Sequence, residues 1–208
     1  MSLLDFDALR ATPRKSEPYD YLVVRHFVPA DSLARVIADF PKADTTGSLP
    51  LSELDVQGAF KTLIEEMDGP EFRDLVEAKF GVSLDGRPTM FTVRGRCHPS
   101  DGKIHTDTGS KIITVLLYLN QDWEADGGRL RILRSPTLDD AAEEVPPTGG
   151  TLLVFRRSER SWHGHQPFEG QRRAIQMNWV TDAGVVAYEQ RRHRVSAFFK
   201  RLNPFRAA

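Results

Sequence analysis

The sequence lacks three features that would place it in special classes of protein. It has one cysteine, Cys97, so it cannot form an intrachain disulfide, and we expect a reducing compartment. Its 28 Lys and Arg residues nearly balance 29 Asp and Glu residues, which argues against an extended nucleic-acid-binding surface. No apolar run approaches the roughly 20 residues that span a bilayer, and the N-terminus has no signal-peptide pattern. We therefore expect a cytoplasmic protein without a transmembrane segment.

The apolar pattern changes along the chain from helical to strand-like. Helical spacing predicts helices near residues 30–40, 58–67 and 70–80, where Pro41 and Gly81 would end the first and the last. From Arg87, short aliphatic runs alternate with turn residues and predict seven strands without interleaved helices, near 88–96, 103–107, 112–119, 129–133, 151–156, 160–166 and 172–180. This order predicts one domain, residues 1–208: a helical support region (1–86), an antiparallel sandwich or barrel (87–182) and a basic tail (183–208).

A histidine and an aspartate stand two residues apart in one of these expected strands. The two-residue period of a strand places His105 and Asp107 on the same face, where they could hold a metal. The pair alone is a weak signal, because a hydrogen-bonded surface couple has the same spacing.

A second histidine pair, His163 and His165, precedes the last expected strand. Two histidines and one carboxylate form the facial triad of non-haem iron(II) oxygenases, which leaves half of the metal's coordination sites open. His163 and His165 have the same parity in an extended segment, so either could complete the triad or simply cap a turn.

Alternation in two strands distinguishes an apolar face from a selectively polar one. In residues 112–119 the odd positions are all aliphatic, whereas Thr114 and Tyr118 share the other face. In residues 172–180 the odd face is again mainly apolar, and Arg172 and Asn178 lie on the even face. We expect the odd face to pack on the helices and the even face to line a polar pocket, where Arg172, rather than Arg173, would bind an anion. The plainer alternative is a core tyrosine and a solvated arginine.

Taken together, the motifs resemble those of the 2-oxoglutarate- and Fe(II)-dependent dioxygenases, within the prolyl 4-hydroxylase-like branch. The resemblance covers about residues 88–180 and rests on four features in order: His105-Thr106-Asp107, Tyr118-Leu119-Asn120-Gln121-Asp122-Trp123, Gly127-Gly128, and His163 followed nine residues later by Arg172. It implies a double-stranded β-helix, a cupin-like jelly roll that packs on helices, in agreement with the alternation.

The resemblance also implies roles for individual residues. His105, Asp107 and His163 match the iron ligands, and His165 has no counterpart among them. Arg172 and Tyr118 match the residues that bind the far carboxylate of 2-oxoglutarate, and Thr114 lies where the family has a threonine near this cosubstrate. The implied reaction hydroxylates a C–H bond with Fe(II), 2-oxoglutarate and O₂, yields succinate and CO₂, and uses ascorbate as a reductant.

The substrate is less defined than the chemistry. A prolyl residue of a protein or peptide is the family-weighted expectation, and amino acids or peptidic, lipid-linked or sugar-linked metabolites are alternatives. Lys111 stands where the family has a substrate-contacting arginine, and Asn178 replaces a tryptophan near the pocket. Arg94, Arg96 and Lys111 could meet an acidic substrate or be solvated edge charges.

Two other classes of protein remain open, a non-catalytic jelly-roll binding module and a zinc hydrolase or lyase that uses the same three ligands. The tail predicts a helix near 186–202. Its basic residues could contact an acidic surface, or the helix could cover the edge of the barrel.

Overall fold

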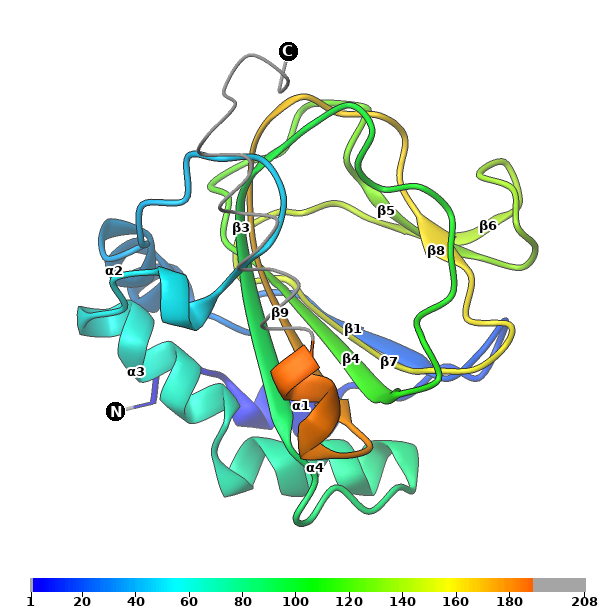
Figure 1. Ribbon diagram of the computed structural model, residues 1–208, viewed down its shortest axis with the longest axis horizontal. Helices are drawn as coiled ribbons and strands as arrows, with labels where there is room; N and C mark the ends of the chain where they lie inside the picture. Colours follow the sequence, from blue (N-terminus) through cyan, green and yellow to red (C-terminus); the bar gives the residue numbers. More distant parts are fainter. Residues whose placement is uncertain (1, 189–208) are drawn as a thin grey trace.

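The computed structural model describes residues 2–188 and consists of two antiparallel sheets with helices on one side (Figure 1). The helical elements are α1 (Phe6–Ala11), α2 (Ala30–Ala38), η1 (Leu51–Glu53), α3 (Gly58–Met67) and α4 (Pro70–Phe80). The strands are β1 (Tyr21–Val24), β2 (Leu49–Pro50), β3 (Thr89–Cys97), β4 (Lys111–Tyr118), β5 (Leu130–Leu133), β6 (Ala141–Val145), β7 (Leu152–Arg156), β8 (His163–Gly164) and β9 (Gly170–Val180).

The larger sheet has the strand order β1-β7-β4-β9-β3-β2, and the smaller sheet has the order β6-β5-β8. All pairs between these strands are antiparallel. The strand order makes neighbours of strands that are distant in the sequence, such as β4 and β9, as in a jelly roll. The expected class of fold, mainly β with packed helices, is confirmed.

The helices cover the outer face of the larger sheet. The odd residues of β4, Ile113, Val115 and Leu117, are fully buried in one apolar cluster with Phe60 of α3 and Phe72 of α4. Trp179 of β9 stacks on Phe72 with ring centroids 5.9 Å apart. This layer is the main hydrophobic core, and it packs the helices against the outer face of the larger sheet.

A second apolar cluster fills part of the space between the two sheets. It joins Tyr118 and Phe155 of the larger sheet to Leu130 and Ile132 of the smaller sheet, with Ala174 beside them. The even face of β4 and β9 thus points inward, as the alternation predicts.

Several expected elements differ from the observed ones. The strand expected at 103–107 is reduced to a single bridge at His105, and the strand expected at 160–166 shrinks to β8, because loops interrupt both segments. The short elements α1, β1, β2 and β6 were not predicted. Residues 183–188 are helical, and the rest of the helix expected at 186–202 lies outside the described residues.

No helix within residues 2–188 is long and apolar enough to cross a membrane.

Candidate metal centre and cosubstrate pocket

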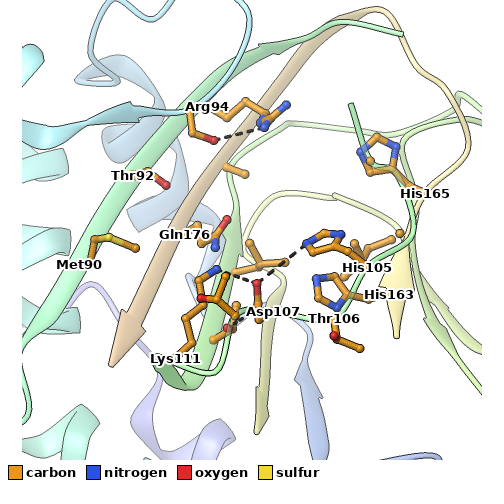
Figure 2. Close-up of a pocket in the computed structure, with 18 of the residues that line it drawn as sticks. Met90, Thr92, Arg94, His105, Thr106, Asp107, Lys111, His163, His165 and Gln176 are labelled. Atoms are coloured by element: carbon orange, nitrogen blue, oxygen red, sulfur yellow. Dashed lines mark hydrogen bonds and ion pairs between the residues drawn. The ribbon is translucent and has the colours of Figure 1, made fainter. Parts of the chain in front are cut away.

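Backbone pairing brings His105 and His163 together, although they are far apart in the sequence. The amide of each residue donates to the carbonyl oxygen of the other, both at 3.0 Å. Their rings consequently lie on the same side, with centroids 4.3 Å apart. Figure 2 shows both rings beside Asp107. One ligand atom from each of these three residues lies within 4.8 Å of the others, the only such group of three found within residues 2–188.

The two imidazoles are oriented by backbone carbonyl groups. His105 Nδ1 lies 2.8 Å from the carbonyl oxygen of Lys103, and His163 Nδ1 lies 2.9 Å from that of Ser161. A carbonyl oxygen only accepts hydrogen bonds, so each Nδ1 carries the hydrogen and each Nε2 keeps a free lone pair. This outer contact is common for metal-binding histidines. Burial lowers the pKa of His163 to about 4, so its ring is neutral at neutral pH.

Asp107 is buried and ionised beside these rings. Its Oδ2 accepts a hydrogen bond from Thr114 Oγ1 at 2.6 Å, and its Oδ1 accepts one from Lys111 Nζ at 2.7 Å. Burial alone would raise the pKa of the carboxyl group, but Lys111, His163 and Thr114 outweigh this effect and hold the pKa below its usual value. Two imidazoles and one carboxylate are a donor set that suits Fe(II).

The three residues open onto a cavity of about 350 Å³ between the sheets. Arg172 and Thr114 also line this cavity, as predicted, and so does Lys111. Arg172 is only 6% exposed. Its Nε donates to the carbonyl oxygen of Gly128 at 2.8 Å, and its Nη2 donates to the Tyr118 hydroxyl at 3.4 Å. The guanidinium group has no acidic partner within residues 2–188, which leaves a buried positive charge facing the cavity.

Other predicted residues lie differently. Tyr118 is fully buried below Arg172, whose Cζ lies 5.1 Å from the centre of the ring, and Tyr118 does not line the cavity. Asn178 is buried and donates to Thr114 Oγ1 at 2.8 Å, so it does not line the cavity either. Arg173 lies on the opposite face of β9, with its Cζ 5.1 Å from the centre of the Phe40 ring.

His165 lines the cavity but stands apart from the three grouped residues, above His105 in Figure 2. Its Nδ1 contacts the carbonyl oxygen of Gln166 at 2.8 Å, and burial lowers its pKa to about 4. The structure thus brings His163, rather than His165, to His105 and Asp107.

Arg96 is exposed and does not line the cavity, because the register of β3 shifts between Arg94 and Arg96. The backbone is closely approached at Gly95, where a Cβ would lie 2.0 Å from the carbonyl oxygen of Ala43. The alternation therefore holds as far as Arg94, which lines the cavity, and is reversed after it.

Reasoning from the sequence named Arg94 beside the metal motif but missed the rest of the cavity wall on β3. Met90, Thr92 and Arg94 alternate along β3 and face the metal residues, with Gln176 of β9 beside them (Figure 2). The alternation in residues 88–96 was a usable signal for this wall, although it fails after Gly95.

Comparisons with known proteins agree with this geometry. Residues 94–181 match the 2OG-Fe(II) oxygenase superfamily. A comparison with curated proteins gave no match. The matched segment contains His105, Asp107, His163 and Arg172 and is similar to the 2OG-Fe(II) oxygenase superfamily, whose enzymes use Fe(II), 2-oxoglutarate and O₂.

Within that superfamily, the fold is similar to solved prolyl 4-hydroxylases. A prolyl 4-hydroxylase from Pseudomonas putida is 21% identical with a TM-score of 0.53, over 84% of this chain and 90% of that one. One from Phytophthora capsici is 17% identical with a TM-score of 0.58, over 88% and 67%. A viral collagen prolyl hydroxylase from Paramecium Bursaria Chlorella virus-1 is 14% identical with a TM-score of 0.50, over 77% and 96%.

Proposed function

We propose that this oxygenase hydroxylates a prolyl residue of a protein or peptide. His105, Asp107 and His163 would hold Fe(II), and Arg172 would bind the far carboxylate of 2-oxoglutarate. When bound, Fe(II) supplies the oxidative decarboxylation of 2-oxoglutarate to succinate and CO₂, in which one atom of O₂ enters succinate and the other enters the substrate C–H bond. The observation that carries the proposal is the buried, acid-free charge of Arg172 in the same cavity as the three metal-binding side chains.

An unpaired buried guanidinium group is costly, so a dianionic cosubstrate gains affinity by neutralising it. Tyr118 supports this role indirectly, because its hydroxyl and its ring both contact Arg172 and restrict where the guanidinium group can turn. Thr114 acts on the metal side of the cavity, since its hydroxyl donates to Asp107.

The charge balance of the cavity favours an uncharged reacting group. Besides Arg172, two cationic side chains line the cavity, and both are already paired with an acidic residue. Arg94 pairs with Asp101, and Lys111 pairs with Asp107. Once Arg172 holds 2-oxoglutarate, every cationic lining residue among residues 2–188 has an acidic partner. A prolyl ring within a peptide suits such a site better than a free amino acid, which must bring two charges into it. Apolar lining residues offer contact area to a ring: Met90, Leu116, Leu130, Val180 and Val185.

A hydrolase that uses the same three ligands fits less well. Asp107 is the only carboxylate that lines the cavity within the described residues, and it belongs to the metal site. Metal-dependent hydrolysis usually needs a further general base for water, and no second carboxylate is placed for that role.

Succinate release tests the proposed substrate. The protein with Fe(II), 2-oxoglutarate and ascorbate is offered prolyl peptides, the same peptides with alanine in place of proline, and free proline. We expect only the prolyl peptides to raise succinate formation above the uncoupled background, with a product that is 16 mass units heavier. Stimulation by free amino acids but by no peptide would contradict the peptide assignment and would leave the metal and cosubstrate sites intact.

A further inference from the structure

Lys111 contacts the Asp107 carboxylate oxygen that faces the His105 imidazole. Asp107 Oδ1 accepts the 2.7 Å hydrogen bond from Lys111 Nζ, and the same oxygen lies 3.9 Å from His105 Nε2. The other oxygen, Oδ2, is taken by Thr114. A metal held by His105, His163 and Asp107 would therefore use the oxygen that the ammonium group already occupies.

Within residues 2–188, the ammonium group of Lys111 forms an ion pair with Asp107 and with no other acidic side chain. Lys111 starts β4, and its amide donates to the carbonyl oxygen of Thr108 at 3.1 Å, which closes the turn after Asp107. Asp107 is its one acidic partner within residues 2–188, and the two side chains are only 15% and 5% exposed. Arg157 holds the same turn from outside, since its Nε donates to the carbonyl oxygen of Asp107 at 3.1 Å. The lysine is thus a built part of the site.

We propose that Lys111 lowers the affinity of the site for divalent metal. This inference rests on the proposed metal site and concerns its regulation. An ammonium group and a divalent cation bound to one oxygen atom are second neighbours and repel each other. The ammonium group also withdraws charge from the carboxylate. Because Asp107 is buried and Lys111 is largely shielded from solvent, salt in the solvent screens this repulsion little.

Lys111 would thus help to determine the free Fe(II) concentration at which the site fills. Half-saturation of this triad needs a higher free Fe(II) concentration than the three ligands alone would require, and the protein loses metal more readily when iron is scarce. Lys111 is a positioning residue in this account, because it acts on the metal through Asp107.

Manganese binding tests the inference without turnover. Metal-free protein is titrated with Mn(II), and the free ion is followed by its electron paramagnetic resonance signal, for wild type, Lys111→Met, Lys111→Arg and Lys103→Met. Lys103→Met is the matched control, because it removes one charge near His105 from a side chain that is exposed. We expect Lys111→Met to bind Mn(II) at least tenfold more tightly than wild type, in low salt and in 0.5 M KCl alike (about 1.4 kcal/mol per tenfold). Lys111→Arg and Lys103→Met should stay within threefold of wild type.

Each contrary result has its own meaning. Unchanged or weaker binding by Lys111→Met, with wild type binding one Mn(II), would overturn the inference and would show that the lysine orients the carboxylate instead. An equal gain in Lys103→Met, or a gain that disappears in salt, would also overturn it, since the effect would then be one of surface charge. Absence of Mn(II) binding by wild type would overturn both this inference and the proposed metal site.

Discussion

The two faces of strands β4 and β9 differ in what their side chains do. On the outer face, Val115 and Met177 are fully buried among the helices and contribute only packing. On the inner face, Thr114 contacts Asp107 and Arg172 faces the cavity. Neighbouring residues in the sequence therefore serve stability and chemistry separately, and substitutions one position apart should affect different measurements.

The largest effect should come from the metal-binding side chains of the cavity. His105→Ala should lower succinate release at least about 100-fold, because two ligands cannot hold the metal in the required geometry. The His105 side chain is 53% exposed, so the free energy of unfolding should change by no more than about 0.5 kcal/mol. Succinate assays and urea unfolding of the same preparation measure both, with His98→Ala as the control. Undiminished turnover by His105→Ala would show that this face does not hold the metal.

The next effect belongs to the outer face. Met177→Ala should lower the free energy of unfolding by about 2–5 kcal/mol, since it leaves a cavity in the main core. Gln176→Ala, at the adjacent position on the inner face, should lower the free energy of unfolding by less than about 1.5 kcal/mol. It removes a half-buried side chain that donates a hydrogen bond to Asn178. Urea unfolding compares the two. Equal losses of stability would mean that the two faces are not separate.

A pair of adjacent arginines gives the sharpest comparison of cosubstrate binding. Arg172→Ala should raise the KM for 2-oxoglutarate roughly tenfold to a hundredfold, because a charge-assisted hydrogen-bonded contact contributes about 1.5–3 kcal/mol. Arg173→Ala, on the opposite face, should leave this KM within twofold. The reverse result would show that the alternation is misassigned in β9.

A further effect is a dependence of stability on pH. His163 and His165 have a pKa of about 4 in the folded protein and about 6.5 when unfolded. Between these values the unfolded chain binds more protons, so the free energy of unfolding of metal-free protein should fall as the pH drops from 6.5 towards 4. We expect roughly 1–3 kcal/mol from each imidazole. Urea unfolding at several pH values should show a shallower fall in His165→Gln, and an unchanged slope would contradict the burial of this neutral ring.

Much of the inner face could be predicted from the sequence because local alternation decides which side a residue takes. The placement of Arg172 and Thr114 in the cavity followed from the alternation alone. Grouping His105 and Asp107 also succeeded, although the expected strand is only one bridge, because that bridge pairs His105 directly with His163.

The features that escaped prediction depend on non-local geometry. β6 has a half-exposed Ala141–Val145 sequence of low strand propensity, and it is fixed by pairing with β5, including the 2.9 Å contact of Arg131 with Glu144. The register shift at Gly95 depends on the carbonyl group of Ala43, from a distant segment. The Lys111–Asp107 contact depends on the closed turn between them, which residue types alone do not specify.

We propose that the inner face of the larger sheet binds Fe(II) and 2-oxoglutarate together. Anaerobic addition of 2-oxoglutarate to the Fe(II)-loaded protein tests it most directly, by the weak visible charge-transfer absorption that chelation of Fe(II) by 2-oxoglutarate produces. The account predicts this absorption in wild type, its loss in His163→Ala, and a roughly tenfold to hundredfold higher 2-oxoglutarate requirement in Arg172→Ala. Absence of the absorption in wild type at saturating 2-oxoglutarate would contradict the account and would favour a non-catalytic binding module.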